Sequence, residues 1–538
     1  MNILRAEKYH LYFLLLLSLV LFFWKINVIP LTDGDSAFYA KVAKNIVQTG
    51  DWITMQYGDK GTIIDKPPLF MWMTAASFKV FGINDFAVAF WHSIMALLTV
   101  IFTYLLGKEL YNARTAFISS LILITSAQFF YMARSPLLDV PLTLFVLLSI
   151  YCFVLYEKRG SLLRFYLSPV FVALAVLTKG PVGLVIPALV IILYIFFNRV
   201  KLPDIRHIIA AVILLLAITL PWFIAEYRIL GQPYLDVLIG KNVGRYLKPV
   251  DTIGSEATKF GKIQPQYDFY SFLLQILILF IPWSGFFYPA VYYAIKKRES
   301  LLPGVFAFAV IIFFSLSLNY KISRYILPAF PAMALLTGKL ISDLFDGDRT
   351  ADRAAKMSAL MALTIVVVPL LSLAFTYFYV RFTDVSGFYT PLIIPFLLPL
   401  CLAMLLGSMA HILGRHRTAF ASISSLTIVS YLMLILTLAI YYPQINPIGR
   451  FCARINSVAR PGDIVCQYKG TDAHFMIYYS DKEVLFLRNK DKMKELLGSG
   501  KKVYCIVEGQ QYADEIINET RGRTKKLESS AQYSLITN

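Results

Sequence analysis

The sequence has few charged residues and few cysteines, and both shortages narrow the class of protein. Of its 538 residues, 16% are charged and 58% are hydrophobic, whereas soluble domains have roughly 25% and 45–50%. The five cysteines show no CxxC or Cys/His spacing, which leaves no metal or redox motif. No Gly-rich phosphate loop is visible. With a mean hydropathy of +0.63, the chain is predicted to be a polytopic α-helical membrane protein.

The hydrophobic residues occur in runs long enough to cross a bilayer, which takes about 20 residues. We predict approximately thirteen transmembrane helices, near residues 11–30, 86–107, 114–132, 140–156, 163–178, 181–198, 208–225, 269–294, 302–318, 322–341, 357–379, 388–412 and 418–441. The first is interpreted as a retained signal anchor, because no A-x-A-like cleavage site follows it and Trp24-Lys25 is typical of an interfacial anchor.

The net charge of +18 would suggest nucleic-acid binding in a soluble protein. Here the basic residues concentrate in alternate short loops between the apolar runs, which is the positive-inside pattern. This pattern predicts a cytoplasmic N-terminus. An odd number of spans then places the C-terminus on the extracytoplasmic side.

Three segments are expected outside the bilayer on that side. The membrane domain covers residues 1–445 and includes a first external loop at 31–85 and a second at 226–268, while residues 446–538 form a small α/β domain. Short apolar runs at residues 464–468, 484–487 and 503–507 predict strands. Helices are predicted at residues 490–497 and 512–519. Cys466 and Cys505 fall on two of these strands, and the sequence leaves open whether they pair.

The first external loop contains two expected helices. The first has an apolar face from Phe38 to Val47, opposed by a polar face that includes Lys41 and Lys44, which suits a helix lying in the membrane interface. The two lysines are interpreted as a solvated face. A second helix is predicted to start at Pro67-Pro68, because proline is tolerated in a first turn, and to end at Gly82.

Ionisable residues gather at the outer ends of the predicted spans. Charges at such depth are costly unless they are paired or functional. Together they suggest a site where cations hold a phosphate on a lipid and a carboxylate orients or deprotonates an acceptor. The residues concerned are Asp33, Asp35, Asp65, Lys66, Arg134, Asp139, Lys179, Arg245, Lys321 and Arg324.

Each of these residues also has a simpler explanation when it is taken alone. Asp35 and Asp139 precede or begin helices and would serve equally as caps or dipole partners. Lys66, Lys179 and Arg324 would serve as lipid-headgroup or snorkelling residues. Asp33 is interpreted as a loop residue. The constellation by itself therefore predicts only a membrane protein with an external polar site.

Several motifs resemble one known family. They are Thr32-Asp33-Gly34-Asp35-Ser36-Ala37-Phe38-Tyr39-Ala40, Gly50-Asp51-Trp52, Asp65-Lys66-Pro67-Pro68-Leu69, Ser135-Pro136-Leu137-Leu138-Asp139, Leu177-Thr178-Lys179-Gly180, Pro221-Trp222 and Lys321-Ile322-Ser323-Arg324-Tyr325-Ile326-Leu327-Pro328. Together they are similar to the polyprenyl-phosphate-dependent GT-C glycosyltransferases, which include aminoarabinose transferases acting on lipid A and protein O-mannosyltransferases. The resemblance covers essentially all spans.

The resemblance implies roles for particular residues. Asp35 matches the catalytic aspartate of the family's first loop, and Asp139 matches its second acidic residue. Cations around the donor phosphate are matched by Lys66, Lys179 and Arg245, and we add Lys321 and Arg324, with Asp65 and Tyr325 in support. The family often has Glu where this chain has Ser36 and Asp65. The change at Ser36 leaves the details of acceptor binding open, whereas Asp65 keeps a carboxylate.

The implied activity is an inverting transfer of a sugar from undecaprenyl phosphate, or a similar lipid, to lipid A or another envelope acceptor. The enzyme would lie in the bacterial inner membrane and need no cofactor beyond its donor; the sequence does not decide metal dependence. Two alternatives stay open: an activity like that of protein O-mannosyltransferases, and a lipid or glycan transporter. A transporter would be expected to have ionisable residues near mid-bilayer rather than at the outer ends of spans.

Overall fold

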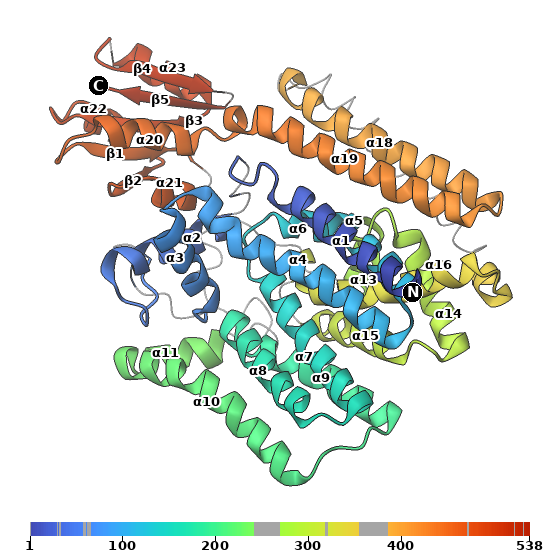
Figure 1. Ribbon diagram of the computed structural model, residues 1–538. Helices are drawn as coiled ribbons and strands as arrows, with labels where there is room; N and C mark the ends of the chain where they lie inside the picture. The colour runs from blue at the N-terminus through green and yellow to red at the C-terminus, as the bar shows by residue number, and fades with distance from the viewer. Residues whose placement is uncertain are drawn as a thin grey trace.

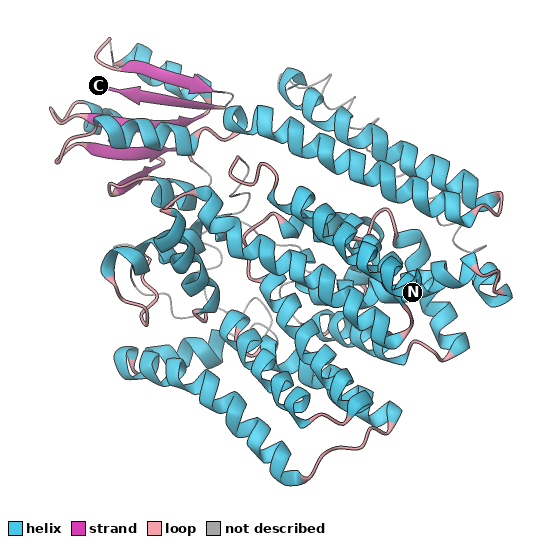
Figure 2. Cartoon of the chain, in the orientation of Figure 1, coloured by secondary structure: helices cyan, strands magenta, loops and turns pink. Residues whose placement is uncertain are grey.

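The computed structural model describes residues 2–28, 31, 34–57, 61, 66–241, 269–317, 321–354, 386–470, 473–520, 522–530 and 532–538. The described part of the chain is mostly helical, and its strands all lie in the C-terminal domain (Figures 1 and 2). The predicted fold class, a helical membrane domain with a small α/β domain after it, is therefore confirmed.

The predicted spans within the described residues coincide with helices or helix pairs. In lipid this is the expected solution for an apolar run, because a helix satisfies its own backbone hydrogen bonds. The helices are α1 (Asn2–Phe23), α4 (Asp85–Leu110), α5 (Ala113–Thr125), α6 (Ala127–Ala133), α7 (Asp139–Arg159), α8 (Leu162–Lys179), α9 (Val182–Asn198), α10 (Ile205–Leu230), α13 (Ser271–Leu279), α14 (Ser284–Lys297), α15 (Leu301–Ser315), α16 (Phe330–Phe345), α18 (Ser386–Ile412) and α19 (His416–Ile445).

By length and composition, seven helices in the described residues can cross a membrane, or eight if the bent pair α5–α6 is one span. Several other apolar helices, such as α9 and α15, are shorter than that test requires. The predicted span at 357–379 lies outside the described residues. The count of thirteen therefore stays a prediction.

The predicted start of the second external segment falls within a helix. The sequence placed its start at residue 226, but α10 continues to Leu230 and is followed by α11 (Gln232–Leu235) and a π-helix, η2 (Asp236–Lys241). Gly231, with a φ of 67°, ends α10.

The bend of 70° between α5 and α6 falls at Ser126. Other elements supply the hydrogen bonds that the break removes from the helix. The backbone N–H of Ala127 donates to Ile281 at 2.8 Å, and the Tyr431 hydroxyl on α19 donates to the Thr125 carbonyl at 2.8 Å. The Trp283 indole donates to the Thr125 hydroxyl at 2.8 Å. Irregular backbone is thereby satisfied inside the protein, as membrane depth requires.

Two helices that the sequence predicts to be external lie between α1 and α4. The first, α2 (Gly34–Thr49), and the second, α3 (Leu69–Phe81), form where the sequence predicted them. Gly82, with a φ of 78°, ends α3. The interpretation of Lys44 as part of a solvated face is wrong, because the C-terminal domain covers it and leaves it 6% exposed.

The C-terminal domain follows α19 and packs against the α2 end of the membrane domain (Figure 1). Its five-stranded sheet has the order β2-β1-β3-β5-β4, with β1 parallel to both β2 and β3 and the β5 contacts antiparallel. Its elements are α20 (Ile448–Val458), β1 (Ile464–Tyr468), α21 (Ala473–Tyr479), β2 (Val484–Leu487), α22 (Lys490–Leu497), β3 (Val503–Glu508), α23 (Gln510–Glu519), β4 (Lys525–Ser530) and β5 (Tyr533–Thr537).

The question left open for Cys466 and Cys505 has a structural answer. They are direct register partners on β1 and β3, and both are buried, yet both are free thiols.

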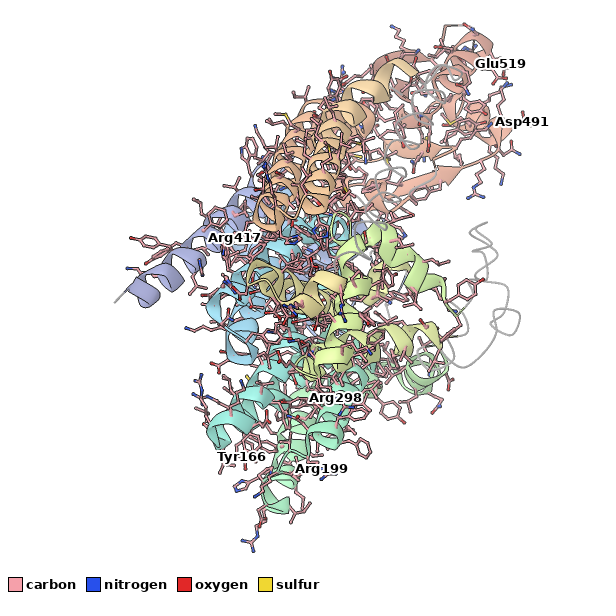
Figure 3. The ribbon with its side chains drawn as sticks, turned by 90° about the vertical axis from the view of Figure 1, so that its right-hand side faces the viewer. Tyr166, Arg199, Arg298, Arg417, Asp491 and Glu519 are labelled. Carbon is pink, nitrogen blue, oxygen red and sulfur yellow. The ribbon has the colours of Figure 1, made fainter. Side chains whose placement is uncertain are left out.

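The basic loops lie away from the C-terminal domain. In Figure 3, Arg199, Arg298 and Arg417 mark three loops that the sequence assigned to the cytoplasm, and they are well separated from Asp491 and Glu519 of that domain. Their placement on opposite sides of a membrane stays a prediction from the charge pattern.

Candidate active site

The candidate site forms where four elements end at the same place. Asp35 is in the first turn of α2, and Asp139 is the first residue of α7. Lys179 is the last residue of α8, and Arg324 lies on a short 3-10 helix, η5 (Ser323–Ala329), that leads into α16. Charged side chains from distant parts of the sequence thus meet at helix ends.

Arg324 connects the two carboxylates. One terminal nitrogen of its guanidinium lies 2.6 Å from Oδ2 of Asp35, and its Nε lies 3.7 Å from Oδ2 of Asp139. The Arg324 side chain is 19% exposed. A planar guanidinium presents several donors in fixed directions, which suits it to hold two acidic groups at once.

Lys179 completes the group. Its Nζ lies 2.5 Å from Oδ1 of Asp139, whose side chain is only 4% exposed. The same ammonium lies 4.6 Å from the centre of the Tyr325 ring, a cation–π distance. The buried carboxylate of Asp139 therefore has a cation on each side, as burial of a charge requires.

The turn after Lys179 explains the Thr178-Lys179-Gly180-Pro181 motif. Gly180 has a φ of 68°, which favours glycine, and its N–H donates to the Val176 carbonyl at 2.7 Å to end α8. A Cβ on Gly180 would lie 3.8 Å from Cγ of Pro67. The Lys66-Pro67 segment therefore runs directly beside the end of α8.

The structure tests the capping interpretation of the two aspartates, and both lie in a first helical turn, where a dipole partner is expected. Asp139 makes no side-chain cap, since the residue before α7 is Leu138 and no cap hydrogen bond forms there. Its carboxylate faces Lys179 and Arg324 instead. Asp35 sits in the first turn of α2, where the helix dipole favours a carboxylate, but it also bonds Arg324.

The remaining candidates are placed as follows. Lys66 is half-buried just before α3, and Lys321 is buried three residues before Arg324. Asp33, Asp65 and Arg245 lie outside the described residues. Arg134 has a structural role, because its guanidinium donates to the carbonyls of Leu21 at 2.8 Å and Trp24 at 3.0 Å and so closes the end of α1.

Sequence reasoning missed His92 on α4. Its Nε2 lies 2.7 Å from the Met132 carbonyl, in the segment that leads to Asp139. A polar ring inside an apolar span was the available signal, since such residues are rarely placed in lipid without a partner.

Within the described ranges no group of three or more His, Cys, Asp or Glu side chains is placed to hold a metal ion. The site holds two cations, Lys179 and Arg324, and two carboxylates that differ in exposure, with Asp35 46% exposed and Asp139 4%.

An apolar groove lies between α9 and α15. Its volume is about 460 Å³, and its lining is hydrophobic apart from one glycine. The groove is lined by Leu189, Leu193, Phe197, Gly304, Val305, Phe308, Ala309, Ile312, Phe313 and Leu316. α9 starts immediately after the Lys179 turn, and Leu316 follows α15 on the way to Lys321. The groove therefore runs along the two helices whose ends border the charged group.

Comparison with known proteins identifies this arrangement. Residues 65–224 match the family described as dolichyl-phosphate-mannose-protein mannosyltransferase. The crystal structure of ArnT from Cupriavidus metallidurans bound to undecaprenyl phosphate superposes with a TM-score of 0.74 at 18% identity, covering 98% of this chain and 97% of that one. The archaeal oligosaccharyltransferase AglB from Archaeoglobus fulgidus gives a TM-score of 0.52 at 13% identity, covering 96% of this chain and 68% of that one. The fold is that of the GT-C membrane glycosyltransferases.

Proteins similar in sequence indicate which type of GT-C glycosyltransferase this chain resembles. A protein of Aquifex aeolicus without an assigned function is 31% identical over 387 residues, 71% of each chain. An undecaprenyl phosphate-alpha-4-amino-4-deoxy-L-arabinose arabinosyl transferase of Proteus mirabilis is 26% identical, over 70% of this chain and 68% of its own length. Its Aeromonas hydrophila counterpart is also 26% identical, over 61% of this chain and 59% of its own length. The chain belongs to the aminoarabinose-transferase type of GT-C glycosyltransferases, enzymes that use lipid-linked sugars.

Proposed function

We propose that this enzyme transfers 4-amino-4-deoxy-L-arabinose from undecaprenyl phosphate to lipid A on the extracytoplasmic face of the bacterial inner membrane. The observation that carries the proposal is the sharing of Arg324 between Asp35 and Asp139, with Lys179 on the other side of Asp139. The names of the Proteus and Aeromonas relatives supply the donor.

The proposed reaction is a single displacement with inversion. An acceptor oxygen forms a bond to the anomeric carbon of the sugar while the bond from that carbon to the phosphate oxygen breaks. The electron pair of the broken bond stays on undecaprenyl phosphate. Charge grows on that phosphate during the step, so Lys179 and Arg324 stabilise the transition state more than the bound donor.

The two carboxylates take different parts. Asp35 is the more exposed and accepts the proton when the acceptor is a hydroxyl. When the acceptor is an ionised phosphate of lipid A, Asp35 orients it instead. Asp139 is buried between two cations, and its role is to hold Lys179 and Arg324 in position for the donor phosphate.

The groove between α9 and α15 suits the lipid part of the donor. A polyprenyl chain is costly to expose to water, so its site must open to lipid while its phosphate reaches the polar group. A hydrophobic groove along α9 and α15, two helices that end near the charged residues in the chain, suits both needs. We assign the donor's isoprenoid chain to this groove, with Lys66 and Lys321 as further cations near its phosphate.

The experiment that tests the proposal is reconstitution of the full chain in proteoliposomes with undecaprenyl-phosphate-linked aminoarabinose and lipid A. Mass spectrometry of the lipid fraction should show lipid A carrying the amino sugar and release of undecaprenyl phosphate. Unmodified lipid A would contradict the proposal that lipid A is the acceptor.

A second candidate is supported by the family match over residues 65–224, whose description names protein mannosylation. Its signature would be glycosylation of an envelope protein, with lipid A unmodified. Intact-mass analysis of envelope proteins from cells with and without the gene separates the two functions.

A further inference from the structure

Lys44 on α2 is buried by the C-terminal domain. Its Nζ donates to the Tyr478 carbonyl at 3.2 Å and lies 2.9 Å from Oδ1 of Asp481, and its side chain is 8% exposed. The Asp481 carboxylate is 61% exposed, so solvent screens that ion pair. The buried bond to the Tyr478 carbonyl is therefore the contact least replaceable by water.

A second contact joins the same two parts of the chain. The Tyr57 hydroxyl lies 2.6 Å from Nδ1 of His474, at the start of α21. Phe38 on α2 packs against both rings, with centroids 4.7 Å from Tyr57 and 5.6 Å from His474. An aromatic cluster and a buried lysine thus attach α21 to successive turns of α2.

The helix α21 also contacts the membrane domain independently of α2. The Tyr479 hydroxyl donates to Oδ1 of Asp85, the first residue of α4, at 3.1 Å. The helix α21 therefore bridges α2 to the start of α4. This bridge fixes α2 relative to the membrane helices.

The orientation of α2 determines where Asp35 lies. At about 1.5 Å per residue, Lys44 is roughly 13 Å from Asp35 along the helix axis, so a tilt of about 5° there moves Asp35 by roughly 1 Å. A displacement of that size is enough to cost about 100-fold in rate when a reacting group is misplaced. The Asp35–Arg324 contact is thus sensitive to how firmly α21 holds α2.

We propose that Lys44 and His474 are positioning residues, through which the C-terminal domain sets the Asp35 carboxylate at the reaction centre. The inference rests on the proposed function, because it assumes that Asp35 serves sugar transfer. It assigns to the C-terminal domain a part in catalysis, through the position of α2.

The test uses the full chain in proteoliposomes and the variants Lys44→Met and Lys44→Arg. Lys44→Met should lower kcat about 10- to 100-fold, leave the KM for the donor within threefold, and speed hydrogen exchange of amides in α2. Lys44→Arg keeps the cation and should recover most of kcat. His474→Phe keeps the aromatic packing but loses the bond to Tyr57, and should lower kcat in the same direction by a smaller factor.

The matched control is Lys494→Met, which removes an exposed ion pair with Glu519 elsewhere in the C-terminal domain. It should leave kcat and exchange in α2 unchanged. The inference is overturned if Lys44→Met keeps kcat within twofold, or if its loss of kcat only follows the fraction of protein that fails to fold, judged by size-exclusion chromatography. Absence of transfer by the unmodified enzyme would refute the proposed function instead.

Discussion

The Arg324 guanidinium bonds the Asp35 carboxylate at 2.6 Å across a separation of 289 residues. The same side chain reaches Asp139 at 3.7 Å. In the proposed mechanism, the donor phosphate meets a cation that already has two acidic partners. We expect binding of the phosphate to share or displace those contacts, which would link donor binding to the position of Asp35.

Replacing Arg324 by lysine tests this link. Lysine keeps the charge but is a point donor that cannot hold two carboxylates in fixed directions. We expect Arg324→Lys to retain donor binding within about tenfold and to lose more in kcat than in KM. Steady-state kinetics with the lipid-linked donor measures both, and a loss confined to KM would contradict the bridging role.

Asp35→Asn tests the role of the exposed carboxylate. The variant should lose about 100- to 10,000-fold in transfer if Asp35 is the base, and bind undecaprenyl phosphate as well as the unmodified enzyme does. Asp51→Asn changes a carboxylate of the same external loop that accepts the N–H groups of Ile53 and Thr54, and it should keep kcat. Unchanged transfer by Asp35→Asn would remove this residue from the mechanism.

Lys179→Met tests the buried pair. Removing one partner of a buried ion pair costs roughly 3–5 kcal/mol in the free energy of unfolding, and we expect the lower end because Arg324 remains 3.7 Å from Asp139. The double variant Lys179→Met with Asp139→Asn should melt at a higher temperature than Lys179→Met alone, since it leaves no uncompensated carboxylate. Thermal melting in detergent makes the comparison, and equal melting temperatures would count against a charge effect.

Asp348 gives stability a defined pH dependence. The Lys297 ammonium, 2.7 Å away, lowers the pKa of this carboxylate below its ordinary value of 3.8, assisted by the N–H groups of Ala351 and Thr350. Its contribution is therefore present above that ordinary value and is lost as pH falls through the lowered pKa. Asp348→Asn should melt below the unmodified protein at pH 7, and the gap should close in acid. A difference in melting temperature that widened in acid would contradict a lowered pKa at Asp348.

The thiols of the C-terminal domain should be unreactive in the folded protein. Burial raises the pKa of Cys452 to about 12 and that of Cys505 well above its usual range, and the thiolate is the reactive form. A maleimide should label Cys452, Cys466 and Cys505 only after denaturation, without prior reduction. If denatured protein labels Cys466 and Cys505 only after reduction, the two are joined in a disulfide.

The sequence predicts the membrane helices well because lipid leaves an apolar run little choice of structure. The same reasoning predicts α3 from Pro67-Pro68 and Gly82, where backbone preferences act locally. The strands β1, β2 and β3 are predicted for a related reason, since short apolar runs between turns favour buried strands. Each of these predictions depends on residues close together in the chain.

The sequence does not predict contacts between distant segments. It places Asp35 and Arg324 at span ends of the same depth, but nothing local specifies that they bond each other. Lys44 shows the limit most clearly. An amphipathic pattern distinguishes a polar face from an apolar one, yet it cannot say that the polar face will meet Tyr478 and Asp481 rather than water. The sequence also does not predict the bend at Ser126, because no Pro or Gly lies next to it.

Because the helix breaks between α5 and α6, a backbone carbonyl at the break takes its hydrogen bond from the hairpin of α18 and α19. The Tyr431 hydroxyl on α19 donates to the Thr125 carbonyl, and the Tyr431 ring stacks on Phe130, with ring centroids 3.9 Å apart. In hydrocarbon no water replaces a lost donor. A relative that shed these last two spans would have to straighten the broken helix or recruit another hydroxyl, so the hairpin and the kink are expected to be gained or lost together.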